Sequence, residues 1–436
     1  MPLASSTMRN KITVFLVSFL LAAGILQAQT ENSPYSRYGL GDMLPSQNLM
    51  SRGIGGVSAA YADIISVNFA NPASYSRLKR ATLDLGVELD SRSLSVINPP
   101  RRYTSASPSI SYVQLGVPLS QSRNWGMVFG LKPISRINYK IERSERLAAI
   151  DSVHTIFEGN GGTYEVYTGT GFAVKNFALG FNVGYRFGNK EYTTRRIFIP
   201  DSAFKVYYGS EHSSRSNFGG LFVSGGIQYN VRLSKKSILR VGATANLQRT
   251  YNGNLNQRVM TYQETQTGID SIDVAQNSET SGDIIYPASY TAGVMFYSGD
   301  KWLIGADLTQ TKWSDYRFFG AKDDVYDSWK LHAGGQILPN LTGAKSYWGR
   351  VTYRGGFFLG KDYVKIGDNQ LPVWGATIGF GFPMRPPTYT NQYSIINTSI
   401  EFGRRGNATN LVRENFLRIG IGLTLSDLWF IKRKYD

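Results

Sequence analysis

The chain has 436 residues, of which 42% are hydrophobic, 13% aromatic and 18% charged, and it contains no cysteine. This composition excludes a disordered chain, a disulfide-stabilised scaffold and a thiolate metal site. The net charge is +16, but the Lys and Arg residues are spread along the chain instead of forming one basic stripe, so we do not expect nucleic-acid binding.

The N-terminus has the three zones of a secretory signal peptide. Arg9 and Lys11 precede an apolar run from Ile12 to Leu26, and the small residue Ala28 follows. The run is shorter than the roughly 20 apolar residues that a membrane-spanning helix needs. We therefore expect residues 1–28 to be a signal peptide cleaved after Ala28, and the mature chain to be exported.

Residues 29–80 lack sustained strand alternation and are rich in small residues, most clearly from Arg52 to Ala60. One interpretation is a flexible periplasmic tail. The other is a plug, here called the hatch, that folds into a barrel lumen, where glycine and alanine permit close packing. Pro72 has a fixed φ and Asn71 can bond nearby backbone groups, so this turn is expected to fix where the hatch meets the first strand. The hatch residues that we single out are Gly55, Gly56, Asn71, Pro72 and Ala73.

From about residue 82 onward, apolar and polar residues alternate in segments of about 10 residues, the length that crosses a bilayer as a tilted strand. Between Phe177 and Phe187, for example, every second residue is large and apolar, and the residues between are small or polar. A water-soluble β-sandwich also gives such alternation. The fourteen predicted strands lie near 82–90, 109–118, 124–141, 163–174, 176–187, 218–231, 237–250, 287–297, 301–311, 328–338, 348–359, 373–382, 393–403 and 415–425.

The connections between these segments alternate between short and long, as in outer-membrane barrels with short periplasmic turns and long outer loops. On this pattern the N-terminal segment and the C-terminus both lie in the periplasm. The long connections are expected at 91–108, 142–162, 188–217, 251–286, 312–327, 360–372 and 404–414. The predicted fold class is therefore all-β: a 14-stranded antiparallel transmembrane β-barrel over residues 81–430, with an N-terminal hatch and a basic periplasmic tail at 431–436.

The seven tryptophans favour a membrane barrel over a sandwich, because indole rings prefer the membrane interface. All of them fall at predicted strand ends. Trp125, Trp302, Trp348 and Trp429 are expected at the periplasmic side, and Trp313, Trp329 and Trp374 at the extracellular side.

A barrel of fourteen strands is too wide for side chains alone to fill. Alternation points several charged residues into the lumen, where they are expected either to hold the hatch in a paired network or to leave an arginine free for a ligand carboxylate. These inward residues are Arg186, Arg240, Arg350, Arg354, Arg418, Asp84, Glu88, Asp307 and Glu401. The lumenal ligand candidates are Arg240, Arg350, Arg354 and Arg418.

The sequence does not favour an enzyme. His332 is the one histidine predicted to face the lumen, and a lone histidine without a partnered nucleophile indicates a hydrogen-bonding role. No catalytic residue, metal site or cofactor is expected.

Two blocks resemble the FadL/TodX-type (OMPP1) family of outer-membrane channels for hydrophobic compounds. They are the stretch from Arg52-Gly53-Ile54-Gly55-Gly56-Val57 to Ala62-Asp63, and Asn68-Phe69-Ala70-Asn71-Pro72-Ala73-Ser74 before the first strand. The opening from Asn32 to Gly41 is similar to the version found in Bacteroidetes-type relatives. The resemblance implies a fourteen-stranded barrel with an N-terminal hatch, and transport of fatty acids or aromatic hydrocarbons.

The family resemblance also implies a kinked third strand that opens the wall sideways. In this chain Gly126, Gly130 and Pro133 lie in the third predicted strand, and proline cannot donate a ladder hydrogen bond. These three residues are the candidates for a lateral gate. The alternative is a bulge without a functional role.

The resemblance leaves two functions open: passive uptake of a lipid-like or aromatic ligand, or a structural or type IX secretion partner of the PorV type. The expected surroundings are the outer membrane with its lipopolysaccharide. The apolar last strand, followed by Trp429 and Phe430, suits recognition by the barrel-assembly machinery.

Overall fold

The computed structural model describes residues 33–96, 101–147, 151–201, 207–265, 268–299, 301–339, 346–366, 369–384, 392–407 and 412–429. The predicted signal peptide and the basic tail at 431–436 lie outside these residues. Within the described part, no helix combines the length and apolar character needed to cross a membrane.

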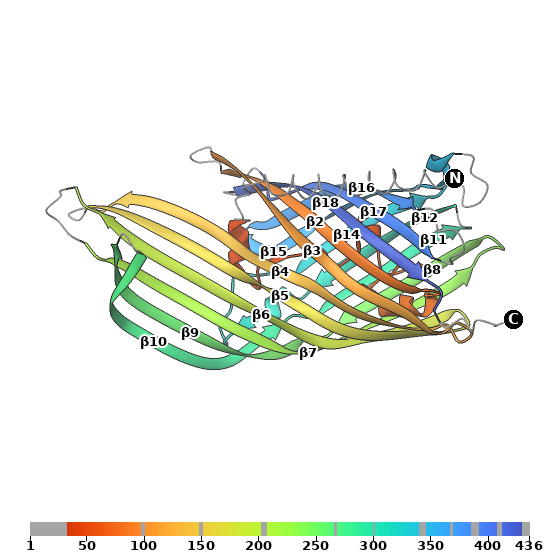
Figure 1. The fold of residues 1–436 in the computed structure, drawn as a ribbon, viewed down its shortest axis with the longest axis horizontal. Helices are drawn as coiled ribbons and strands as arrows, with labels where there is room; N and C mark the ends of the chain where they lie inside the picture. The colour runs from red at the N-terminus through yellow and green to blue at the C-terminus, as the bar shows by residue number, and fades with distance from the viewer. Residues whose placement is uncertain are drawn as a thin grey trace, which may run out of the picture.

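Fourteen antiparallel wall strands close into one barrel, which confirms the predicted fold class and strand number (Figure 1). Two of the wall strands are each interrupted once: β8 continues into β9, and β10 continues into β11. The last strand pairs with the first from Val412 opposite Val96 to Asp427 opposite Ala81. The wall strands are β2 (Ala81–Val96), β3 (Arg101–Ser120), β4 (Trp125–Arg146), β5 (Ser152–Val174), β6 (Phe177–Ile199), β7 (Gly209–Arg232), β8 (Ser237–Asn246), β9 (Arg249–Thr265), β10 (Gly268–Tyr286), β11 (Ser289–Ser298), β12 (Trp302–Thr311), β14 (Ser328–Ile337), β15 (Thr352–Ile366), β16 (Asn369–Pro383), β17 (Tyr393–Arg405) and β18 (Val412–Asp427).

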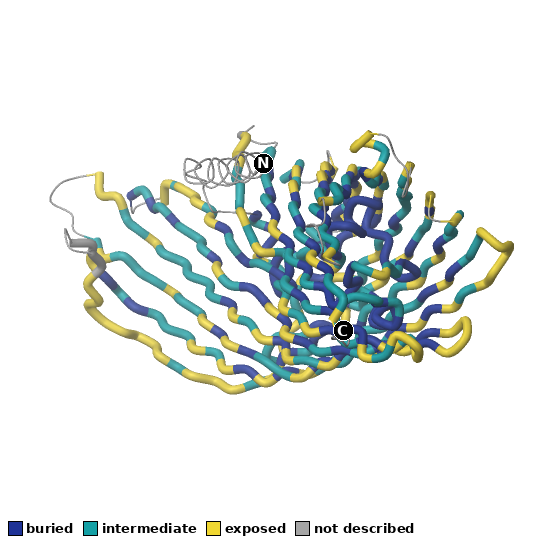
Figure 2. The backbone as a smooth tube through the Cα atoms, turned by 45° about the vertical axis from the view of Figure 1, so that its right-hand side comes forward, coloured by how far each residue is buried: buried dark blue, intermediate teal, exposed yellow. Residues whose placement is uncertain are grey.

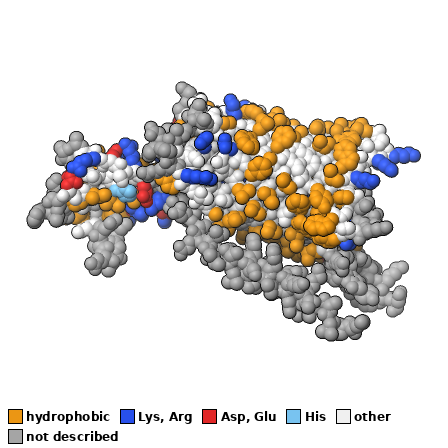
Figure 3. All heavy atoms as spheres, turned by 90° about the horizontal axis from the view of Figure 1, so that it is seen from above, with side chains coloured by type: hydrophobic (Ala, Val, Ile, Leu, Met, Phe, Trp, Pro, Cys, Tyr) orange, Lys and Arg blue, Asp and Glu red, His pale blue; other side chains and the backbone are white. Residues whose placement is uncertain are grey.

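The outer face of the wall is apolar, as the alternation predicts. Along β6, Phe177, Phe181 and Tyr185 are 45%, 47% and 50% exposed, whereas the alternate positions, such as Asn182, are buried and point inward. Figure 3 shows the hydrophobic side chains gathered in a broad band across the face of the barrel seen in this view. In water this band would be costly to expose, so it marks the part of the wall that faces lipid.

The predicted long loops at 142–162, 188–217 and 251–286 are mostly strand, and this expectation was wrong. The ends of β4 to β7, with β9 and β10, continue as a curved sheet beyond the rest of the barrel (Figure 1). The rings of Tyr164 and Phe187 stack on the outer wall, 6.0 Å between centroids, below this projecting sheet. This sheet lies beyond the apolar band, so the lipid-facing alternation that marks the other strands is lost there, although Val153, Met260 and Tyr262 are buried.

Six of the seven tryptophans are exposed, as predicted for an aromatic girdle; five of them lie at or beside strand ends, and Trp374 lies within β16. Trp313 is the exception. It lies in η3 (Trp313–Asp315), is 2% exposed, and stacks on Tyr363 with 4.5 Å between ring centroids. The connection after β12 folds inward over the mouth of the barrel, and this turns Trp313 away from lipid.

Residues 33–80 lie inside the barrel, and Figure 2 shows most of this path as buried. Three short elements follow one another: η1 (Pro34–Arg37), β1 (Asp42–Met43) and α2 (Leu49–Gly53). They are followed by η2 (Pro72–Arg77), which packs against the inner faces of β3 to β7 near their periplasmic ends.

The hatch spans the length of the lumen, so the connection pattern, which put the N-terminal segment in the periplasm, does not hold for residues 33–80. The Tyr35 hydroxyl donates to the carbonyl of Val412, 2.6 Å away, at the extracellular start of β18. Ser33 bonds the carboxylate of Glu414, two residues further along the same strand. There the segment packs Tyr35 and Leu40 into a buried cluster that includes Tyr363 of the wall.

Candidate functional site

The wall is incompletely paired at one place, between β3 and β4. The ladder between them runs from Ser120 opposite Trp125 to Val113 opposite Leu131, and the described residues of the two strands share no pairing beyond this point. By contrast, β2 pairs with β3, and β4 with β5, along nearly their full lengths. The extracellular half of this seam is therefore a split in the wall.

The hatch covers the free edge of β4 inside the split. Its strand β1 pairs with β4, with Asp42 opposite Arg136 and Met43 opposite Ser135. The amide of Leu44 donates to the carbonyl of Ile134 at 2.9 Å. The unpaired edge of β4 thus has a partner that belongs to the plug and not to the wall.

One of the three predicted gate residues lies at the split. Pro133 follows the last β3–β4 pair closely, and the β4–β5 register shifts between Pro133 and Ser135. Gly126 and Gly130 lie in the paired half of the seam. They make room for the hatch and for another side chain: a Cβ at Gly126 would lie 2.2 Å from the Tyr75 carbonyl oxygen, and one at Gly130 within 2.5 Å of the Tyr167 ring.

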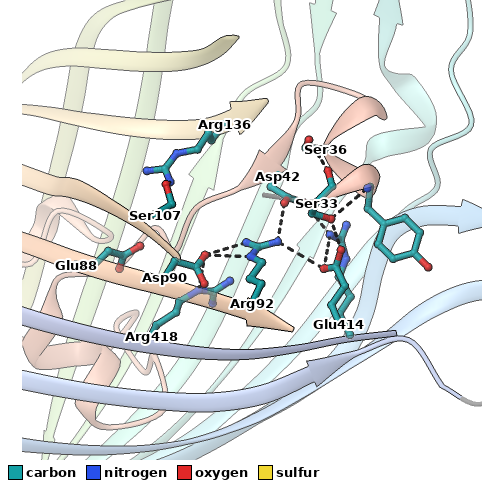
Figure 4. A network of polar contacts seen from close by, with 12 residues as sticks. Ser33, Ser36, Asp42, Glu88, Asp90, Arg92, Ser107, Arg136, Glu414 and Arg418 are labelled. Atoms are coloured by element: carbon teal, nitrogen blue, oxygen red, sulfur yellow. Dashed lines mark hydrogen bonds and ion pairs between the residues drawn. The ribbon is translucent and has the colours of Figure 1, made fainter. Parts of the chain in front are cut away.

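A chain of buried ion pairs joins the hatch to the wall beside the split, on strands β2, β17 and β18, as Figure 4 shows. Asp42 accepts from Arg92 at 2.6 Å and from Arg405 at 2.7 Å. Burial opposes the ionisation of Asp42, but the two guanidinium groups lower the pKa of its carboxyl below the ordinary value. Arg92 also contacts Asp90, and Arg405 contacts Asp362 and Glu414.

Arg52 of α2 makes a second junction, deeper in the lumen. Its guanidinium pairs with Glu88 of β2 and with Glu401 of β17. Burial disfavours the cation, yet these two carboxylates raise the pKa of Arg52 above its ordinary value. Glu401 in turn pairs with Arg418, which also contacts Asp90. The paired network expected from the sequence is therefore present.

Of the four ligand candidates, Arg240, Arg354 and Arg418 lie in the lumen, and each already has protein partners. Arg240 donates to Asn230 at 2.7 Å, and Arg354 donates to Gln336 at 2.8 Å. The prediction for Arg350 was wrong: it lies in η4 (Tyr347–Arg350), exposed at the periplasmic end. The 3₁₀ turn before β15 shifts Arg350 out of the strand alternation on which the prediction rested.

The predicted hatch residues hold the plug to the wall. Gly55 and Gly56 have φ of +76° and +91°, which favour glycine, and Nδ1 of His332 lies 2.6 Å from the Gly55 carbonyl. Asn71 caps η2 by accepting from the Ala73 amide at 3.0 Å, and its own amide group donates to two backbone carbonyls. The expected hydrogen-bonding role of His332 is confirmed.

A cavity of about 260 Å³ remains between the hatch and the wall. Its lining includes much of the ion-pair network, so it is not the mostly apolar pocket that would suit a simple hydrocarbon site. Near the split, however, the lining is apolar: Met43, Leu44, Pro133 and Ile134. The cavity therefore extends from charged walls to the place where the wall is unpaired.

Sequence reasoning missed the partners at the mouth, namely Asp42, Arg92, Arg405 and Glu414. Three of them, Arg92, Arg405 and Glu414, lie in segments predicted to be long loops, so no inward or outward direction was predicted for their side chains. Asp42 has no local signal, because its role depends on a strand that pairs with β4 more than 90 residues away in sequence.

Comparison with known proteins identifies a family and a shared fold. A family model described as BamG matches residues 8–436. The fold is similar to the P. putida toluene transporter TodX, with 16% identity over 89% of this chain and 100% of that chain and a TM-score of 0.56. It is also similar to CymD, a monoaromatic hydrocarbon channel (14% identity, 90% and 99% coverage, TM-score 0.53), and to a Pseudomonas aeruginosa FadL homologue (12%, 88% and 98%, 0.55).

No curated protein matches the sequence. At the identities of the solved structures the likeness establishes a shared fold, so the predicted FadL-type barrel is confirmed and the chain is a β-barrel of the outer membrane. The Bacteroidetes-like branch stays a prediction.

Proposed function

Since the chain belongs to the BamG family and has the fold of solved outer-membrane hydrocarbon channels, we propose that it is an outer-membrane channel for the passive uptake of hydrophobic small molecules. The observation that carries the proposal is the split between β3 and β4, with an apolar end of the lumenal cavity beside it. A molecule in the cavity has Pro133 and Ile134 between it and the lipid.

The size of the cavity favours a small aromatic compound over a long-chain fatty acid. An apolar cavity of about 150 Å³ is enough to bind benzene, and the cavity here is about 260 Å³. We therefore place single-ring aromatic compounds first among the substrates. Such a compound would lie at the apolar end of the cavity beside the split, since the charged part of the lining does not suit a hydrocarbon.

Exit through the wall is favoured over exit to the periplasm. An apolar molecule gains roughly 25 cal/mol per Å² of surface on entering lipid, and it gains nothing on entering water. The hatch also fills the path toward the periplasm, where η2 packs against five wall strands. The proposed route is therefore sideways, past β1 and Pro133.

The test joins the two sides of the split. Because the chain has no cysteine, the pair Ser107→Cys and Arg136→Cys gives two unique thiols, which a cleavable bifunctional thiol reagent can connect. We expect cells with the connected barrel to take up less labelled alkylbenzene, and cleavage of the reagent to restore uptake.

The matched control is Thr193→Cys with Ser213→Cys, two residues that already face each other in the complete ladder between β6 and β7. Connecting them should leave uptake unchanged. If connection across the split also leaves uptake unchanged, the lateral route is wrong. If the unaltered protein takes up no labelled compound at equal surface abundance, the channel itself is wrong.

A second function is supported by a different observation. The lumen is crossed by buried ion pairs that hold the hatch, and the projecting sheet ends in β10, whose edge from Gly268 to Gly282 has no strand partner on its outer side among the described residues. A firmly filled barrel with an open sheet edge suits a structural partner of the barrel-assembly or secretion machinery. Co-isolation of such a complex, lost on deletion of 266–284 while the barrel still folds, would support this function.

A further inference from the structure

The turns at the periplasmic end carry exposed cations that have no carboxylate partner among the described residues. Asp300 is the one acidic residue that the sequence places in any of the six turns joining strands at this end. Figure 3 shows basic side chains at this end of the barrel, beyond the apolar band. The exposed cations, here called the periplasmic rim, are Arg123, Lys175, Arg232, Lys235, Lys236, Lys301 and Arg350.

The opposite end of the protein is charged in a different way. On the projecting sheet, cations are matched with carboxylates: Arg195 contacts Glu158 and Glu211, and Arg215 contacts Glu191 at 2.6 Å. The charges there largely cancel. The rim therefore carries a local excess of positive charge that is not found at the projecting sheet.

Exposed apolar side chains alternate with the rim cations. Lys175 lies between Val174 and Phe177, which are 64% and 45% exposed. Leu233, 56% exposed, follows Arg232 directly. Apolar residues so exposed beside cations are characteristic of a membrane–water interface, where the stem of Lys or Arg lies in the apolar layer and its head reaches the phosphates.

The rim also follows the circumference of the barrel. Its residues come from the turns after β3, β5, β7, β11 and β14. In three of these turns a rim cation lies one or two residues from an exposed tryptophan. The pairs are Arg123 with Trp125, Lys301 with Trp302 and Arg350 with Trp348. A docked protein would cover one side of the barrel, whereas lipid surrounds it.

We propose that the periplasmic rim binds the phosphodiester headgroups of anionic phospholipids in the adjacent leaflet of the outer membrane. Anionic headgroups carry a net negative charge that each exposed cation can neutralise, whereas zwitterionic headgroups carry no net charge. The interaction fixes the depth of the barrel in the membrane and is independent of what the lumen carries.

The test uses the full-length barrel in nanodiscs that contain phosphatidylglycerol and phosphatidylcholine in equal amounts. The barrel is released into detergent, and the retained lipids are identified by native mass spectrometry. We expect phosphatidylglycerol to be enriched about fivefold over phosphatidylcholine at low salt, and the enrichment to fall as salt rises.

A variant with Arg232→Gln, Lys235→Gln, Lys236→Gln and Lys301→Gln should lose most of the enrichment, and the corresponding Lys→Arg variant should keep it. The matched control, Arg196→Gln with Lys322→Gln, removes two exposed cations at the extracellular end and should behave like the unaltered protein. Heat-modifiable migration in gels verifies that each barrel is folded. Two results would overturn the proposal: equal retention of both lipids by the unaltered barrel, and unchanged enrichment in the folded rim variant. After the first result, an acidic protein partner of the rim would be the explanation to test.

Discussion

The guanidinium Nη1 of Arg136 lies 2.5 Å from the hydroxyl oxygen of Ser107, on the far side of the split between β4 and β3. Both residues belong to wall strands, and the described residues around them form no ladder across this seam. This side-chain hydrogen bond therefore joins the two wall strands at a place where their described residues share no backbone ladder. On the same side of β4, the hatch strand supplies the backbone partners.

Replacing Arg136 with Ala should make the split easier to open. One such hydrogen bond contributes about 1 kcal/mol, which corresponds to about fivefold in the opening equilibrium. The expected result is faster uptake of labelled alkylbenzene at equal surface abundance. Arg143→Ala is the control, because Arg143 lies on the same strand and pairs with Glu145 at an exposed site. Equal rates for both variants would exclude a restraining role for Arg136.

Replacing Asp42 with Asn should loosen the hatch at neutral pH. The change leaves two buried guanidinium groups short of one charge partner, at a cost of about 3 kcal/mol. Hydrogen exchange measured by mass spectrometry should therefore be faster over residues 40–44, and Asp270→Asn, at an exposed site, should have no such effect.

The titration of the Asp42 carboxyl determines whether the hatch is loosened by acid or by base. The folded-state pKa of Asp42 is lowered, so its stabilisation is complete above the unfolded value of about 3.9 and is lost as pH falls through the folded value. After correction for intrinsic rates, exchange over residues 40–44 should increase with acid in the unaltered protein. The Asp42→Asn variant lacks the titrating group and should respond less; an equally strong response to acid in that variant would show that other carboxylates dominate.

Replacing Ile421 with Arg should destabilise the barrel by about 2–4 kcal/mol, because its side chain faces lipid near the middle of β18. Leu425→Arg places the same charge on the same face but near the periplasmic interface, where the cost is about 0–1 kcal/mol. Urea unfolding in vesicles measures both. Equal costs would contradict the depth assigned to these residues.

Replacing Asn71 with Leu should expose the hatch to protease. The change removes hydrogen bonds to Ala59 and Ile227 and the cap of η2, and it leaves buried backbone groups unpaired at about 1–3 kcal/mol each. Cleavage within 33–80 is measured in outer membranes. Asn176→Leu changes an exposed turn asparagine and should cleave like the unaltered protein; if Asn71→Leu does so too, the turn is only a connector.

The wall was predictable because lipid imposes a simple rule on it. Each membrane-facing position, such as Phe181 or Leu417, must be apolar, and its neighbours must suit the lumen. Six tryptophans are exposed as an aromatic girdle requires. The projecting sheet does not touch lipid, so its strands lack the apolar alternation and were predicted to be polar loops.

The site was predictable only in part. Pro133 can be identified locally, since proline interrupts a ladder whatever the partner strand is. The pairing of β1 with β4 and the contacts of Asp42 are long-range, and no local pattern encodes them. For Arg350 a local pattern gave the wrong answer. A single 3₁₀ turn places this residue outside the strand, so the alternation does not determine the direction of its side chain.

The course of the hatch through the lumen has a consequence for the order of biogenesis. Ser33 lies at the extracellular mouth, whereas η2 lies at the other end, so the chain runs the height of a wall that β18 and β2 later seal. If the barrel closed first, the hatch would have to enter the lumen afterwards. Its charged side chains would then cross the narrow space in which Arg52, Glu88 and Glu401 now form ion pairs, without partners of their own. We therefore expect the hatch to be in place before the first and last strands pair.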